Sequence, residues 1–299
     1  INGLRGNTSG FMVDGAWNLN VGSNGTAFGV ANGTVMTVLD LLQATDSQAV
    51  SGVLYGGNSA MSGGSIWIPN NSLMKKAGEV TLRAYDHVYE SLAAGMRPAE
   101  LVALMRDAQA ALGGSDAWSM ALFGPASAYP HGTSQPQQIE MGQIVLMDCG
   151  CDVQGYQSDI SRTFVFGEPS ARQREVWDTV RKGQQIAFET ALPGTPAGQV
   201  DDAVRAYYES LGYGPGYATP GLSHRTGHGI GMDGHESVNF VHGENTPLKA
   251  GMCFSNEPGI YIFDEFGVRL EDCLYMTEHG PAWFTVPPDS LDDPVGRLG

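Results

Sequence analysis

Apolar residues recur at helical spacing along two adjacent stretches in the first half of the chain. Residues 79–95, EVTLRAYDHVYESLAAG, place them three and four positions apart and end at Gly95, which favours helix termination. Residues 97–114, RPAELVALMRDAQAALGG, repeat that spacing. Residues 141–148, MGQIVLMD, form a short continuous apolar run, which is typical of a buried strand. The pattern predicts two helices and then a strand that ends in the carboxylate of Asp148.

The same order of elements recurs further along the chain. Residues 170–194 and 196–212 predict two more helices, and residues 249–257, KAGMCFSNE, predict another strand that ends in a carboxylate. Matched positions indicate an internal repeat: Gly95, Leu101 and Gly113 recur as Gly194, Val200 and Gly212, Gly142 and Asp148 as Gly251 and Glu257, and Gly155 and Asp159 as Gly267 and Glu271. We therefore predict an α+β fold of two halves, each with two helices followed by two strands, related by a pseudo-twofold axis.

Charge and composition narrow the classes of partner. The 299-residue chain carries 32 acidic and 16 basic residues, a formal net charge of -16, whereas nucleic acids and anionic membranes attract basic surfaces. We therefore expect neither as a partner. No apolar run approaches the roughly 18 residues of a membrane span, and the first residues lack the pattern of a signal peptide. The four cysteines form no CxxC pair, so we expect them to be reduced and buried, in a cytoplasmic protein.

Four acidic residues occupy matched places in the two copies of the repeat: Asp148, Asp159, Glu257 and Glu271. Taken singly, an acid after a strand is more often a turn former or a helix cap than a metal ligand. Joint recurrence beside apolar strands argues for convergence, since packing alone gives little reason to keep acids there. Converging carboxylates raise one another's pKa, and cations relieve the repulsion. With one imidazole the set suits two divalent ions, Mn above all, with Co, Zn or Fe also possible.

The stretch HRTGHGIGMDGHE, residues 224–236, places three histidines on a glycine-rich backbone. His228 lies between glycines that let the main chain pass close to an ion, so we interpret it as the imidazole ligand. If the loop folds back, His224 and His235 face the open side, where they would bind a substrate carbonyl or carboxylate and stabilise a tetrahedral intermediate. His131, in YPHG, occupies a comparable place in the first copy and is a second candidate for the substrate pocket.

Four ordered motifs, MDCGCDVQGYQSDISRTF, HRTGHGIGMDGHE, NEPGIY and VRLED, resemble those of the pita-bread metallopeptidase family, which includes methionine aminopeptidase, aminopeptidase P and prolidase. The resemblance implies a pita-bread catalytic domain over residues 79–299 around a curved antiparallel sheet. It implies metal ligation by Asp148, Asp159, His228, Glu257 and Glu271, with Glu257 also handling the proton of a bridging water, and substrate roles for His131, His224 and His235.

Details of these motifs look more like the proline-specific branch of the family than like methionine aminopeptidase. The details are HRTGHGIG, the PHG at 130–132, and VRLED with Arg269, which we expect to bind substrate. Residues 1–78 differ from that branch, whose members usually carry a larger N-terminal domain. This segment is rich in Gly, Asn, Ser and Thr and poor in charge. We assign it no function and consider it part of a small N-terminal domain at most.

Three functions are compatible with these features. The leading hypothesis is a metal-dependent Xaa-Pro peptidase, in particular a homodimeric dipeptidase acting on small peptides, in which a hydroxide that bridges two ions attacks the carbonyl before proline. The first alternative is a lyase on the same scaffold, similar to the family's dimethylsulfoniopropionate-cleaving members. The second is a binding protein that has lost catalysis, although a binder has no need for five ligand residues.

Overall fold

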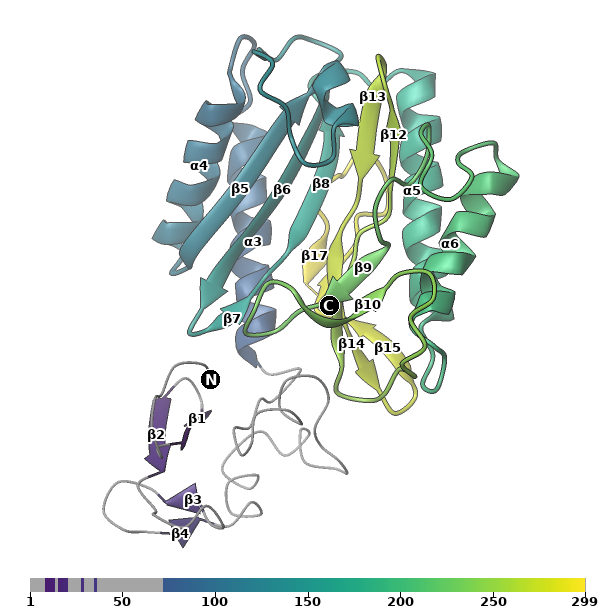
Figure 1. Cartoon of the computed structure of the whole chain (residues 1–299). Coiled ribbons are helices and arrows are strands. Elements are labelled where there is room, and N and C mark those ends of the chain that lie inside the picture. The colour runs from purple at the N-terminus through teal and green to yellow at the C-terminus, as the bar shows by residue number, and fades with distance from the viewer. Residues whose placement is uncertain (1–8, 14–15, 21–27, 30–34, 37–71, 299) are drawn as a thin grey trace. The chain divides into compact units, whose positions relative to one another are not determined.

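The computed structural model describes residues 9–13, 16–20, 28–29, 35–36 and 72–298 (Figure 1). The chain divides into two compact units, Ile1–Asn71 and Ser72–Gly299. The described residues of the first unit form two antiparallel pairs, β1 (Ser9–Val13) with β2 (Ala16–Asn20) and β3 (Phe28–Gly29) with β4 (Val35–Met36). Most of the 1–78 segment lies outside the described residues, so its assignment stays a prediction.

The first half of the second unit follows the predicted order of two helices and then strands. Its elements are α3 (Ser72–Glu90), α4 (Pro98–Ala111), β5 (Ser115–Phe123), the 3-10 helix η2 (Gly124–Ala128), β6 (Ile144–Val153), β7 (Tyr156–Gln157) and β8 (Ile160–Val165). The unit starts with its first helix at Ser72, seven residues before the boundary suggested at residue 79. β6 does not end at Asp148 as predicted, because its last two residues continue the ladder by pairing with β7.

The second half repeats the pair of helices and then adds more strands. Its elements are α5 (Ala171–Thr190), α6 (Gly198–Ser210), β9 (Gly227–Gly229), β10 (Glu236–Phe240), β11 (Cys253–Asn256), β12 (Gly259–Ile262), β13 (Phe266–Arg269), β14 (Asp272–Thr277), β15 (Gly280–Trp283), β16 (Thr285–Val286) and β17 (Arg297–Leu298). α5 begins with a capping box, in which Ser170 and Gln173 exchange hydrogen bonds. Within the described ranges, no helix combines the length and apolarity needed to cross a membrane.

The strands of the second unit form antiparallel sheets. β5 pairs with one edge of β6, and β7 and β8 pair with successive parts of its other edge. The second half contributes a five-stranded sheet in the order β10-β9-β11-β14-β15 and the hairpin β12-β13. Figure 1 shows α3 and α4 beside the first set of strands and α5 and α6 beside the second. The arrangement confirms the predicted α+β class with antiparallel sheets.

β6 is buried on both faces and links the cores of the two halves. Val145 and Met147 belong to the apolar cluster that contains residues of α3 and α4. Ile144 and Leu146 belong to the cluster that contains residues of α5 and α6. Since side chains alternate along a strand, Asp148 shares the face of Ile144 and Leu146, which is the face turned towards the second half. Packing on both faces thus fixes the position of this acid.

Candidate metal centre

Each half brings two acids to the point where neighbouring strands pair. Asp148 lies on β6, and Asp159 immediately precedes β8, the antiparallel partner of β6. Glu257 immediately follows β11, and Glu271 immediately precedes β14, the antiparallel partner of β11. In the second half the register places Asn256 opposite Asp272, so Glu257 and Glu271, the next residues along, lie opposite each other at the end of the ladder. In each half the two acids thus belong to neighbouring antiparallel strands, although Asp148 lies within β6 and Glu257 follows the end of β11.

The described residues contain three groups whose ligand atoms all lie within 4.8 Å of one another. The groups are Asp148 with Asp159 and Glu271, His228 with Glu257 and Glu271, and Asp159 with His228 and His235. Together they include all five predicted ligands. Two carboxylates belong to more than one group, Glu271 to the first two and Asp159 to the first and third, so each is placed to serve two neighbouring ions.

His228 presents one ring nitrogen to the acids. Its Nδ1 lies 3.0 Å from the carbonyl oxygen of Gly229, and because a carbonyl only accepts, Nδ1 carries the proton. Nε2 is then free of a proton and lies 3.5 Å from Asp159 Oδ2 and 3.4 Å from Glu257 Oε1. This tautomer is the one that a metal ligand needs.

The glycines beside His228 are explained by close contact between strands. A Cβ atom on Gly227 would lie 2.2 Å from the carbonyl oxygen of Ser255, and one on Gly229 would lie 2.9 Å from that of Glu236. Side chains at these positions would push β9 away from β11 and β10. The glycines therefore position His228 by allowing β9 to pack closely against β10 and β11.

Burial and mutual repulsion raise the pKa values of three of the acids, which favours their protonated forms. Desolvation, followed by the charges of Asp159, Glu257 and Asp148, raises the pKa of Glu271. Desolvation also raises the pKa of Glu257 to about 7, and His228 and Arg269 oppose the shift. For Asp159 the same two causes, burial and then the charge of Asp148, raise the pKa. Without cations the cluster needs protons, and cations would replace them.

Glu271 provides a test of whether the residues fit metal ions. Its side chain is buried, and Oε2 lies 2.7 Å from the Ser161 hydroxyl, which donates to it. Oε1 is also buried and has no hydrogen-bond partner among the described residues. A buried carboxylate oxygen in this state is costly unless a cation binds it. The donor set of carboxylates and one imidazole fits divalent ions of the borderline class.

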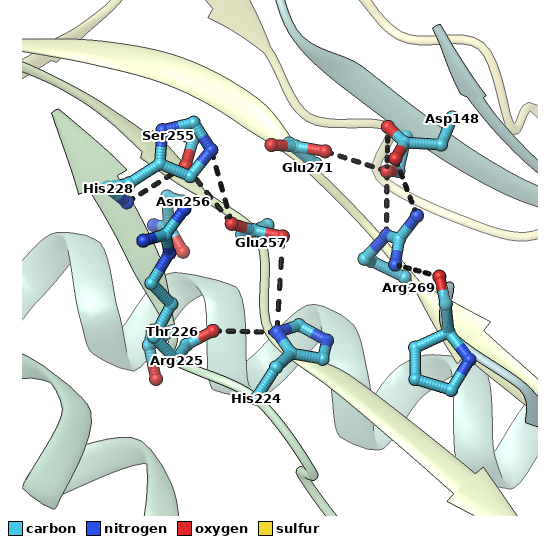
Figure 2. Close-up of polar contacts among 12 residues, drawn as sticks. Asp148, His224, Arg225, Thr226, His228, Ser255, Asn256, Glu257, Arg269 and Glu271 are labelled. Atoms are coloured by element: carbon cyan, nitrogen blue, oxygen red, sulfur yellow. Dashed lines mark hydrogen bonds and ion pairs between the residues drawn. The ribbon is translucent and has the colours of Figure 1, made fainter. Parts of the chain in front are cut away.

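Arg269 lies inside the cluster as the partner of Asp148 (Figure 2). Its Nη2 donates to Asp148 Oδ2 at 2.7 Å, and its Nε donates to the Ser161 hydroxyl at 2.9 Å. Nη1 lies 3.2 Å from the carbonyl oxygen of Pro130 and 3.3 Å from the Tyr261 hydroxyl. The guanidinium is thus engaged by protein groups on all sides, and its role towards substrate stays a prediction.

His224 is held by hydrogen bonds at both ring nitrogens. Nδ1 lies 2.7 Å from the carbonyl oxygen of Arg225, so it donates, and Nε2 accepts from the Tyr261 hydroxyl at 2.7 Å. Burial, and then the charge of Arg269, lower the pKa of His224 to about 3, which keeps the ring neutral. Nδ1 also lies 4.0 Å from Glu257 Oε2, so the ring borders the cluster.

The other two predicted histidines lie on the exposed side of the cluster. The ring of His235 is 4.3 Å from that of His228 between centroids, and burial lowers its pKa. The ring of His131 is 6.5 Å from that of His224. Both residues are exposed, in contrast to the two imidazoles beside them. The structure therefore brings every predicted site residue together, with two histidines inside and two outside.

Three residues at the site were not predicted from the sequence: Ser161, Ser255 and Tyr261. Ser161 follows Asp159 by two positions, and Ser255 precedes Glu257 by two positions. A spacing of two puts side chains on the same face of a strand, and this signal could have found both serines. The contact between Tyr261 and His224 joins residues 37 apart and had no comparable local signal.

Comparisons with known proteins agree with this geometry. The metallopeptidase family M24 matches residues 72–278. The chain is 35% identical over 215 residues to an Xaa-Pro dipeptidase of Lactobacillus delbrueckii subsp. lactis, covering 71% of this chain and 57% of the relative. It is 36% identical over 212 residues to an Xaa-Pro dipeptidase of Pyrococcus furiosus, covering 70% and 59%.

Solved structures show the same similarity. An X-Pro aminopeptidase from Thermotoga maritima aligns with a TM-score of 0.69 at 30% identity, over 73% of this chain and 60% of that one. A prolidase from Pyrococcus furiosus aligns with a TM-score of 0.66 at 34% identity, over 71% and 62%.

These matches define a class of metal-dependent peptidases with the pita-bread fold. The chain belongs to the metallopeptidase family M24. It spans less than two thirds of the length of the relatives named above.

Proposed function

We propose that the chain is a dinuclear-metal peptidase that cleaves Xaa-Pro bonds, with Xaa-Pro dipeptides as preferred substrates. One observation carries the proposal: side chains suited to two divalent ions lie together in a chain that is 35% identical to an Xaa-Pro dipeptidase. The proposed ligands are Asp148, Asp159, His228, Glu257 and Glu271. We propose manganese as the ion, because carboxylates outnumber imidazoles in this set.

The protein's part in catalysis begins with holding and neutralising charge. Bound ions would lower the pKa of a water molecule and polarise the scissile carbonyl. Glu271, which belongs to two ligand groups, would connect the two ion positions. Arg269 would keep Asp148 in place through the 2.7 Å ion pair between them. The four acids come from strand pairs anchored by the core, which preorganises the site.

Glu257 is the proposed proton carrier. A general base must lie within reach of the proton that it removes, and Glu257 belongs to the ligand group of His228 and Glu271. Its two carboxylate oxygens lie near different imidazoles, Oε1 by His228 and Oε2 by His224. We propose that Glu257 accepts the proton of the attacking water and delivers it to the proline nitrogen as the peptide bond breaks.

The exposed histidines are the proposed substrate contacts. His235 stands beside His228 on the exposed side, where its ring could donate to the oxygen that becomes negative in the transition state. His131 stands beside His224 and is available to the substrate's main chain. His224 would act through Nδ1–H, which would exchange the Arg225 carbonyl for a substrate oxygen.

Substrate class is tested by parallel assays of the manganese-reconstituted protein. We expect hydrolysis of Xaa-Pro dipeptides, slower cleavage of longer Xaa-Pro peptides, and no release of dimethyl sulfide from dimethylsulfoniopropionate. Matched Xaa-Ala dipeptides serve as the control for proline specificity. Lyase activity without peptide cleavage would overturn the proposal, and so would equal rates on the Xaa-Ala controls.

A further inference from the structure

We propose that two serine side chains position the metal ligands, with Ser161 serving the ion beside Asp148 and Ser255 serving the ion beside His228. The inference rests on the proposed metal centre and extends it. Both serines are positioning residues, because each hydroxyl contacts ligand residues instead of substrate. The contacts of each serine, and the way that the ligand groups divide, lead to this assignment.

Ser161 joins acids from the two halves of the repeat. It lies on β8 and is fully buried, and its Oγ lies 2.8 Å from Asp148 Oδ1 and 2.7 Å from Glu271 Oε2. The backbone N–H of Glu271 donates to the Ser161 carbonyl at 3.1 Å. Ser161 therefore holds Glu271 through both its main chain and its side chain.

Hydrogen-bond capacity explains why the Ser161 hydroxyl matters. A hydroxyl carries one proton, so Ser161 donates to one carboxylate at a time, while its lone pairs accept from Arg269 Nε at 2.9 Å. Arg269 also binds Asp148, which closes a network around both carboxylates. The network fixes their orientations and leaves Glu271 Oε1 without a protein partner, as a metal ligand would be.

Ser255 performs the corresponding task on the other side of the site (Figure 2). It lies on β11 and is fully buried. Its Oγ accepts from the backbone N–H of His228 at 3.1 Å and donates to Glu257 Oε1 at 3.4 Å. Ser255 thus ties the strand that carries His228 to the side chain of Glu257.

The ligand groups divide in the same way as the serine contacts. Of the three groups in the described part of the chain, Asp148 occurs only in the one with Asp159 and Glu271. Glu257 occurs only in the one with His228 and Glu271. Ser161 contacts Asp148 and the shared Glu271, whereas Ser255 contacts Glu257 and the main chain of His228. Each serine should therefore affect mainly one ion.

A purely structural role of Ser161 and Ser255 would give a different experimental result. Removal of a group that hydrogen-bonds to metal ligands typically lowers metal affinity by about 10- to 100-fold. If the serines only fill space in buried strands, Ser→Ala would lower the stability of the metal-free protein and would not distinguish between the ions. Metal affinity measured ion by ion separates these two possibilities.

The experiment is a calorimetric titration of metal-free protein with Co²⁺ in single-ion backgrounds. His228→Ala should leave the ion beside Asp148, and Asp148→Ala should leave the ion beside His228. Adding Ser161→Ala should weaken Co²⁺ binding by about 10- to 100-fold in the first background and less in the second. Ser255→Ala should show the reverse order, and Ser161→Thr, which keeps the hydroxyl, should recover affinity. Thermal unfolding of each metal-free variant provides the control.

The outcomes separate this inference from the proposed function. If the wild-type protein binds two ions but both serine variants weaken each ion equally, or neither ion, the inference is wrong and the proposed function stands. If the wild-type protein binds no divalent ion, both fail. The inference is supported if Ser161→Ala has its larger effect in the His228→Ala background and Ser255→Ala has its larger effect in the Asp148→Ala background.

Discussion

At the scale of single residues, the histidines of the glycine-rich segment 224–236 differ in what their ring nitrogens contact. His228 donates from Nδ1 to a carbonyl and turns Nε2 towards Asp159 and Glu257. His235 is exposed, yet it also lies within 4.8 Å of ligand atoms of His228 and Asp159. The metal role of the first and the substrate role of the second can therefore be separated by substitution.

We expect His228→Ala to lose one of the two ions and His235→Ala to keep both. Without its imidazole the buried His228 position supplies no ligand, whereas His235 should affect turnover, by about 10²- to 10³-fold, as a lost oxyanion donor does. Metal content by elemental analysis and the rate on an Xaa-Pro dipeptide check both variants. An equal loss of metal in the two variants would show that His235 is a ligand.

Glu257→Gln should separate ligation from proton transfer. The substitution keeps the shape of the side chain and removes the proton acceptor, so turnover should fall by about 10²- to 10⁴-fold even when excess Mn²⁺ restores the ions. The rate is measured with increasing Mn²⁺, with metal content determined in parallel. Full recovery of the rate in excess metal would contradict the proton-carrier role and leave Glu257 as a ligand only.

The sequence was sufficient to predict which residues gather at the site, but not how they are held. The recurrence of acids in two copies identified Asp148 and Glu271, because a repeat implies matched positions in space. The substrate role predicted for Arg269 stays a prediction, and its contact with Asp148, which lies 121 positions earlier, was not predicted. Such a contact depends on how the two halves pack, and no local pattern encodes it.

At the scale of elements, the repeat is visible in the conformation of its glycines. Gly95 and Gly194 lie in the loops between paired helices with φ of +83° and +88°, and Gly142 and Gly251 precede their strands with φ of +84° and +89°. The matched glycines Gly155 and Gly267 do not share a similar backbone conformation. Gly155 is a turn residue with φ of +92°, whereas Gly267 lies in β13.

Gly95→Ala and Gly194→Ala should each destabilise the fold. A Cβ atom at either position meets nothing within 4 Å, so the expected loss of about 1–2 kcal/mol comes from the left-handed backbone alone. Gly234→Ala is the matched control, because its Cβ also meets open space and its φ lies outside the range that strains L residues. Urea unfolding measures all three. A Gly234 variant as unstable as the others would contradict this explanation.

Element boundaries were less predictable than element types. The strand that carries Asp148 continues to Val153, because β7 turns back and pairs with its end. β5 escaped prediction because its first residues are exposed, so its pattern is not that of a buried strand. Both features follow from pairing with a neighbouring strand, which a local apolar pattern does not record.

At the scale of the whole molecule, the metal-free protein should lose stability as the pH rises. Glu257 has an ordinary pKa of 4.5 and a pKa of about 7 in the fold. Between these values the folded state keeps a proton that the unfolded state has lost, so the stability that Glu257 contributes falls as pH rises from about 4.5 to about 7. Asp159 and Glu271, whose pKa values are also raised, act in the same direction.

Thermal unfolding of the metal-free protein across this pH range measures the effect. Metal-free Glu257→Gln is the control and should show a shallower decline, because it lacks one of the titrating groups. Excess Mn²⁺ should remove the decline in the wild-type protein, since bound cations replace the protons. A decline of the same size with and without metal would contradict this account of the cluster.

The central claim is that two ions held by both halves of the fold enable cleavage before proline. The most direct test is a titration of the metal-free protein with Mn²⁺, following the hydrolysis of an Xaa-Pro dipeptide. We expect negligible hydrolysis without metal and a rate that rises until about two equivalents are bound per chain, as a two-metal site requires. A rate that is independent of Mn²⁺, or no cleavage at any metal ratio, would contradict it.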